Sequence, residues 1–178
     1  MAVTLIAHTE VGSGGVANVE FTSIPGTYDD LWIQMSIQGQ GVTSNAVGYL
    51  MRFNSDTAIN YSQTGVRNVG ASPTTTRLQN FSYIIASQAR SYASGTYYDF
   101  ASASIYIPNY SNSSNNKQII IEDGGGNMQS ATDQYLNCWA NLWRSTSAIS
   151  SIQIGRLAFN DYKMAQYSTI SLYGITKA

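Results

Sequence analysis

Few side chains in this sequence have the types and spacing that catalysis needs. His8, in the segment LIAHTE, is the only histidine among the 178 residues. The sequence also contains no G-x-S-x-G elbow, phosphate-binding loop, G-x-G-x-x-G fingerprint or H-E-x-x-H motif. A single histidine in such a segment is far more often a strand or interface residue than a general base. We therefore predict no catalytic role for His8.

Carboxylates offer a second possible chemistry, since a glycosidase uses two of them across a cleft. The candidates are Asp29, Asp30, Glu122, Asp123 and Asp133. They fall at the ends of predicted strands and in turns, where carboxylates are usually solvated or cap the turn. The stretch EDGGGNMQSATD (122–133) has oxygen ligands but lacks the alternating acidic pattern of a calcium hand. We expect no enzyme activity, no bound metal and no cofactor.

The single cysteine, Cys138, excludes an intrachain disulfide and a multi-cysteine zinc site. It lies in LNCWANLW, at the same alternate positions as Leu136, Ala140 and Leu142. Free cysteines are among the side chains most often buried, and no histidine lies nearby in the sequence to activate this one. We predict that Cys138 is an unreactive core residue.

Aromatic and amide side chains form a more informative pattern. Segment 31–38 alternates apolar side chains with tryptophan, glutamine and serine, so a strand there has a second face that is polar and aromatic but uncharged. The candidates for contact through such second faces are Trp32, Gln34, Gln38, Tyr106, Trp139, Trp143 and Tyr173. Tryptophan and tyrosine bury a large area at small entropic cost, which suits a subunit interface, and they also suit carbohydrate recognition. We favour the interface and keep glycan contact as the alternative.

Nearly every apolar segment has the period of two that is typical of a β-strand, and glycine, proline and asparagine separate the segments. The predicted strands are 3–9, 16–22, 31–38, 48–53, 61–69, 81–87, 97–107, 117–123, 135–143, 149–159 and 168–175. Long polar loops are predicted at 39–47, 70–77 and 110–116.

Roughly ten short strands without a capped amphipathic helix indicate one all-β domain over residues 1–178. The strand spacing favours a single antiparallel β-sandwich, of the jelly-roll kind. Each alternating strand needs one buried face, which defines the core. The predicted core residues are Leu31, Ile33, Met35, Ile105, Ile107, Leu136, Cys138, Leu142, Ile152, Ile154, Ile170 and Leu172.

Composition limits the partners of the chain. Charged residues make up 11 % of it, against roughly 25 % in an ordinary soluble domain, and the formal net charge is −1. The nine basic residues are scattered, so there is no basic stripe for nucleic acid. No apolar segment approaches the length that spans a membrane, and the N-terminal segment lacks the basic and apolar regions of a signal peptide. We expect synthesis in a cytoplasm, with neither nucleic acid nor membrane as a partner.

Five segments of the sequence carry a resemblance to known proteins. They are VGSGGVANVEFTSIPGTYDDLWI (11–33), RFNSDTAINYS (52–62), IYIPNY (105–110), LWRSTSAISSIQI (142–154) and YSTISLYGITKA (167–178). Together they resemble a group of small tailed-phage proteins, common in marine and cyanobacterial phages, that are described as virion structural, tail-fibre or capsid-associated. The likeness extends from Val11 to the C-terminus and is weakest over 65–95. These are folding motifs, so the resemblance implies a β-rich virion protein and supplies no catalytic residue.

The resemblance implies a non-enzymatic virion structural protein, and we expect a capsid decoration (cement) protein that stabilises or coats the head. A head-fibre or tail-fibre component is one alternative, and a carbohydrate-binding module that contacts host glycans is another. Fibres usually carry a long N-terminal attachment region, whereas a strand is predicted here from about Val3, which favours decoration. We expect a homo-oligomer, a trimer, bound to the major capsid protein or to other virion proteins. An uncharged face avoids like-charge repulsion around a symmetry axis.

Overall fold

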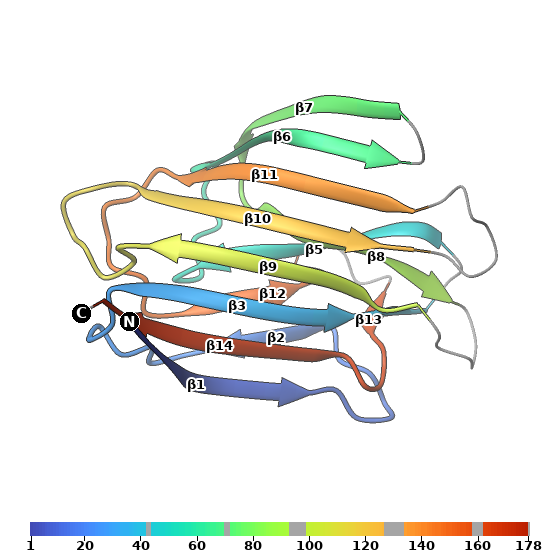
Figure 1. The fold of residues 1–178 in the computed structure, drawn as a ribbon, viewed down its shortest axis with the longest axis horizontal. Helices are drawn as coiled ribbons and strands as arrows, with labels where there is room; N and C mark the ends of the chain where they lie inside the picture. Colours follow the sequence, from blue (N-terminus) through green and yellow to red (C-terminus); the bar gives the residue numbers. More distant parts are fainter. Residues whose placement is uncertain (42–43, 70–71, 93–98, 127–133, 158–161, 178) are drawn as a thin grey trace.

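The computed structural model describes residues 1–41, 44–69, 72–92, 99–126, 134–157 and 162–177. Its strands form two sheets that face each other (Figure 1). In spatial order, the eight-stranded sheet contains β1 (Ala2–Glu10), β14 (Thr169–Thr176), β3 (Asp30–Ile37), β9 (Ala101–Pro108), β10 (Lys117–Gly125), β11 (Tyr135–Trp143), β6 (Tyr61–Val69) and β7 (Ser72–Phe81). The six-stranded sheet contains β13 (Lys163–Met164), β4 (Gly39–Gln40), β8 (Ile84–Tyr92), β5 (Ser44–Phe53), β12 (Ile152–Gly155) and β2 (Asn18–Phe21). The predicted antiparallel β-sandwich is confirmed, and the jelly-roll connectivity stays a prediction.

The hydrophobic core fills the space between the two sheets. Neighbouring strands are antiparallel throughout the eight-stranded sheet, and in the other sheet β4 and β8 run parallel. Across the core, β8 packs against β9, β10 and β6. Strand β3 shows the underlying pattern, because the apolar side chains of every second residue point inward and are at most 3 % exposed.

Most of the predicted core is confirmed, and the exception is one strand. The buried members are Leu31, Ile33, Met35, Ile105, Ile107, Ile152, Ile154, Ile170 and Leu172. On β11 the prediction is wrong, since Leu136 is 64 % exposed, Cys138 is exposed and Leu142 is only half-buried. The opposite face of β11, with its two tryptophans and two asparagines, is the one that points into the core.

The inward face of β11 packs its large rings and gives each of its two amide nitrogens an acceptor, while the side-chain oxygens of Asn137 and Asn141 make no hydrogen bond with a described residue. Trp139 lies close over Gly65 of β6, where an added methyl group would be 2.6 Å from the indole ring and 2.1 Å from a backbone carbonyl of β11. Asn137 donates to the Asp123 carboxylate at 3.1 Å. Asn141 donates to a backbone carbonyl of β10 at 3.2 Å. Buried amides that find such acceptors cost far less than unpaired ones.

Two of the predicted loops contain strands. Segment 39–47 includes β4 and the start of β5, and segment 70–77 overlaps β7. The loop at 110–116 is confirmed, and segment 81–87 includes the turn between β7 and β8. Parts of the predicted strands 97–107 and 149–159 lie outside the described residues. Strand β7 is an edge strand with mostly exposed residues on both faces, so it has no apolar alternation to reveal it.

Candidate functional site

The outer face of the eight-stranded sheet carries one continuous row of large side chains. The strand register places Leu5, Tyr173, Trp32, Tyr106 and Ile120 side by side on β1, β14, β3, β9 and β10. We call these residues the aromatic row. Trp32 and Tyr173 have ring centroids 5.7 Å apart and are half-buried, as is Tyr106. Leu5 and Ile120, at the two ends of the row, are 54 % and 44 % exposed.

A polar row runs beside the aromatic row. Ser171, Gln34, Ser104 and Glu122 pair with one another across β14, β3, β9 and β10. Trp32 Nε1 and Gln34 Nε2 each donate a hydrogen bond of 2.9 Å to Ser104 Oγ. A serine hydroxyl can accept two hydrogen bonds and donate one, so these contacts use its acceptor capacity. The Ser104 O–H therefore remains as a donor on the outer face.

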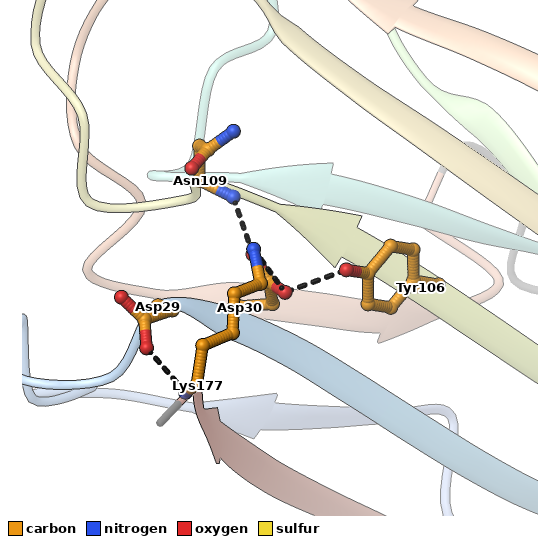
Figure 2. A network of polar contacts seen from close by, with 5 residues as sticks. All are labelled: Asp29, Asp30, Tyr106, Asn109 and Lys177. Carbon is orange, nitrogen blue, oxygen red and sulfur yellow. Dashed lines mark hydrogen bonds and ion pairs between the residues drawn. The ribbon is translucent and has the colours of Figure 1, made fainter. Parts of the chain in front are cut away.

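Asp30, buried at the start of β3, is surrounded by hydrogen-bond donors (Figure 2). Tyr106 OH donates to its Oδ2 at 2.5 Å, and the backbone N–H of Asn109 donates to its Oδ1 at 3.0 Å. Lys177 Nζ lies 2.9 and 3.0 Å from the two oxygens, while the Lys177 backbone N–H donates to Asp29 at 2.6 Å. This network ties the end of β14 to β3 and holds the Tyr106 ring within the aromatic row.

The pKa of Asp30 is set by opposing effects. Burial alone would raise it, but hydrogen bonds from Tyr106, Asn109 and Lys177, with the charge of Lys177, hold the pKa below its usual range. The hydrogen bond to Asp30 in turn raises the pKa of Tyr106 and that of Lys177. Because the folded pKa of Asp30 lies below the unfolded value of about 3.9, its contribution to stability is present above that pH. That contribution is lost as the pH falls through the folded pKa.

We expect Asp30→Asn to lower the free energy of unfolding by about 1–3 kcal/mol at neutral pH, because an amide cannot accept from all the donors that face the carboxylate. Lys177→Met should have a clearly smaller effect, since the Lys177 side chain is 54 % exposed and its ion pair is screened by solvent. Urea denaturation of both variants shows which substitution lowers the free energy of unfolding more. A loss at Lys177 equal to or larger than the loss at Asp30 would contradict this account of the network.

The outer face is hollowed between β9 and β10. This β9–β10 hollow has a volume of about 200 Å³ and is lined by Ser104, Tyr106, Ile120 and Glu122. A further hollow of about 320 Å³ lies over β6, β7, β10 and β11, and its lining includes Ser62, Thr64, Arg77, Gln79, Gln118 and Leu142. Hydroxyl and amide side chains dominate the larger hollow, whereas the smaller one combines a hydroxyl, an aromatic ring, an aliphatic side chain and a carboxylate. Such groups recognise uncharged polar partners, either another protein surface or a small polyhydroxylated molecule.

The structure brings four of the sequence candidates together and separates the other three. The four on the outer face are Trp32, Gln34, Tyr106 and Tyr173. Trp139 and Trp143 are 2 % exposed and lie in the core, so the prediction that they occupy a contact face is wrong. Gln38 is also buried, because β3 ends at Ile37 and the backbone of Gln38 instead bonds to Ala165 and Ser168. Contact of the four outer residues with another molecule stays a prediction.

The carboxylate candidates point in different directions. Glu122 is exposed on the outer face, whereas its neighbour Asp123 is buried on the inner face of the same strand. Asp29 and Asp30 belong to the network in Figure 2. Asp133 lies outside the described residues. The structure therefore gives no geometry in which two described candidates flank a substrate as a glycosidase pair does.

His8 and Cys138 both extend the polar row. His8 lies on β1, as predicted, and its Nδ1 is 2.8 Å from the hydroxyl oxygen of Ser171. Cys138 lies on β11 opposite Glu122 and is exposed. The prediction of a buried thiol is wrong because the outer face of β11 carries its aliphatic side chains and the inner face its tryptophans.

Three residues of this face, Leu5, Ser104 and Ile120, are not among the candidates predicted from the sequence. Ser104 and Ile120 fall in predicted strands, and Ser104 has the same parity as the candidate Tyr106, whereas the isoleucine run 119–121 gives no sign of which face Ile120 occupies. Leu5 falls in the predicted strand 3–9. What the sequence could not show is the strand register, which makes these residues neighbours of Trp32 and Tyr106.

Two features are absent from the part of the chain that the structure describes. No three His, Cys, Asp or Glu side chains there gather closely enough to hold a metal ion. None of its elements is a helix with the length and apolar character that a membrane span requires. In comparison with known proteins, no family model matches the chain and no curated protein matches it at a significant level.

Proposed function

We propose that this chain is a non-enzymatic structural protein of a phage virion, a decoration (cement) protein that coats the head as a homo-oligomer, most simply a trimer. The resemblance of its folding motifs to small tailed-phage virion proteins supports this proposal. The observation that carries it is the outer face of the eight-stranded sheet, which is broad and nearly uncharged. On the described part of that face, the register places the charged side chains Glu10, Arg77 and Glu122 far apart, with Asp30 paired to Lys177.

The edge at β1 is the best candidate for contact between copies. Among the described residues, strand β1 pairs only with β14, so no described strand occupies its other edge. Val3 and Leu5 on this strand are 46 % and 54 % exposed, and Met1, just before it, is 85 % exposed. A free strand edge with exposed apolar side chains is a liability unless a partner covers it. Because this edge carries few charged side chains, symmetric contact between copies would not bring like charges together.

Copy number per particle tests the proposed function most directly. Quantitative mass spectrometry of purified virions would compare the amount of this chain with the amount of the major capsid protein. Decoration predicts comparable amounts, because every part of the shell is coated. A copy number that matches the tail or its fibres would favour the fibre alternative, and absence from purified virions would overturn the proposal.

We expect Leu5→Glu to weaken self-association by at least about tenfold, since symmetry would bring buried like charges together. Val66→Glu is the matched control, because Val66 is 47 % exposed on the same face but lies six strands away from β1 in the sheet order. Light scattering over a concentration series measures both variants beside the unaltered protein. An unaltered protein that stays monomeric throughout, or equal effects of the two substitutions, would contradict the β1 contact.

A further inference from the structure

The β9–β10 hollow combines two apolar walls with one free donor and one free acceptor. The ring of Tyr106 and the side chain of Ile120 provide the apolar walls. Ser104 provides the donor, because Trp32 and Gln34 already occupy the acceptor sites of its hydroxyl. Glu122 provides the acceptor, since its carboxylate is exposed and makes no hydrogen bond or ion pair with another described residue.

These walls are fixed before any ligand arrives. The hydroxyl of Tyr106 is held by Asp30, itself anchored by the backbone of Asn109 and by Lys177 (Figure 2). Ser104 is held by hydrogen bonds from two neighbours on β3. The four lining side chains stand on strands β9 and β10 rather than on loops. A site whose groups are already ordered loses little conformational entropy when it binds.

We propose that the β9–β10 hollow is a binding subsite for a neutral sugar ring. One face of a pyranose carries C–H groups that pack on Tyr106 and Ile120. Its hydroxyls are both donors and acceptors, so one can donate to the Glu122 carboxylate while another accepts from Ser104. A volume of about 200 Å³ accommodates a single ring, and so small a site gives a dissociation constant on the order of 1 mM.

Other small ligands fit the hollow less well. A metal cation needs several oxygen lone pairs, but both acceptor sites of Ser104 are already used and Glu122 is the single carboxylate among the described residues that line the hollow. An anion, including an acidic sugar, would be repelled by Glu122. A neutral molecule with both donors and acceptors uses all the groups that line the hollow.

The sugar subsite goes beyond the proposed function and does not depend on it. The hollow lies between the fourth and fifth strands of the sheet order, roughly 17 Å from the β1 edge at a usual strand spacing. Both surfaces can therefore be occupied in one assembly. If many copies coat a particle, weak subsites add up to avid binding of a glycan surface.

Saturation-transfer NMR on the full chain tests the subsite, with the methyl glycosides of glucose, galactose, mannose and N-acetylglucosamine as probes and N-acetylneuraminic acid as the acidic comparison. We expect transfer to at least one neutral glycoside, strongest at C–H protons of one ring face. Glu122→Gln should weaken that binding by about tenfold, because a hydrogen bond to a charged acceptor is replaced by a neutral one. Glu10→Gln removes a carboxylate from the same sheet face outside the hollow and should change nothing.

Three results would overturn the subsite. They are no transfer to any neutral glycoside at concentrations well above the millimolar range, tighter binding of the acidic sugar, and binding that is unchanged in Glu122→Gln. Ile120→Ser gives an independent check, since it removes an apolar wall without altering charge and should also weaken binding. Circular dichroism of each variant confirms the fold. Failure of these tests leaves the copy number in virions unaffected, so it is distinct from failure of the decoration proposal.

Discussion

Trp143→Ala should lower the free energy of unfolding by about 3–5 kcal/mol, the usual cost of truncating a large buried aromatic side chain. Trp143 is 2 % exposed, and its ring centroid lies 5.4 Å from that of Phe53 and 6.3 Å from that of Tyr61. Its Nε1 also donates to Asp56 at 2.7 Å. Burial would raise the pKa of Asp56, but hydrogen bonds that include this one hold it below its usual range. Truncation thus removes both packing and a donor.

Two further variants separate these contributions. Trp143→Phe keeps a ring in the core but loses the donor to Asp56, so we expect a loss of about 1–2 kcal/mol. Trp32→Ala removes a tryptophan that is only half-buried on the outer face, and its cost should be clearly smaller than that of Trp143→Ala. Chemical denaturation followed by circular dichroism measures all three. Equal losses for Trp32→Ala and Trp143→Ala would contradict the placement of the two side chains.

The contrast between these tryptophans shows that alternation in the sequence locates a strand but does not by itself identify its buried face. Alternation located β11 at 135–143 with the same bounds as the structure. It placed the wrong face inward, because one face offered leucine, alanine and cysteine side chains and the other offered large rings beside asparagines. That choice depends on partners distant in sequence, namely Gly65 beneath Trp139 and acceptors on β10 for the amides.

Strand β3 was easier because its two faces differ more. Inward residues such as Ile33 and Met35 are apolar, whereas the outer residues Trp32 and Gln34 carry hydrogen-bonding groups. Strand β7 was harder for the opposite reason. An edge strand with solvent on both faces has no hydrophobic period, so its threonine-rich sequence looks like a loop.

The candidate site was predictable only in part, because it is a property of the sheet rather than of any one strand. Parity along single strands placed Trp32, Tyr106 and Tyr173 on second faces. The aromatic row exists because β14, β3 and β9 are adjacent in space although they are far apart in the chain. The same adjacency brings Ser104 within 2.9 Å of two donors from β3, a contact that no local pattern contains.

Asp123 is the second residue for which we expect a large effect. Its carboxylate is 2 % exposed on the inner face of β10. Oδ2 accepts from the backbone N–H of Gln88 and from Asn137 Nδ2, each at 3.1 Å, and Oδ1 accepts from Trp139 Nε1 at 3.2 Å. This carboxylate therefore joins β8 of one sheet to β10 and β11 of the other. Asp123→Ala would leave three buried donors without an acceptor, and we expect a loss of about 3 kcal/mol or more.

Glu122→Gln is the matched control for Asp123, because Glu122 is the preceding residue on the same strand but faces solvent. It should change the free energy of unfolding by less than about 0.5 kcal/mol. A comparable loss in Glu122→Gln and Asp123→Ala would contradict the inward orientation of the Asp123 carboxylate.

The burial of Asp123 also predicts how stability depends on pH. Burial raises the pKa of Asp123, and hydrogen bonds from Gln88, Asn137 and Trp139 with the charge of Arg67 offset this only in part. Between the unfolded value of about 3.9 and this higher folded pKa, the folded chain binds more protons than the unfolded chain. The contribution of Asp123 to the free energy of unfolding therefore falls as the pH rises.

Asp123→Asn has no carboxylate at this position to titrate, so its stability lacks this pH dependence. The amount by which it destabilises the protein should shrink as the pH rises from about 4 towards neutrality. Asp30 and Asp56, whose pKa values are lowered, act below this window. Urea denaturation of the unaltered protein and Asp123→Asn at a series of pH values measures the difference, and a difference that grows with pH would show that Asp123 is stabilised as a charged group.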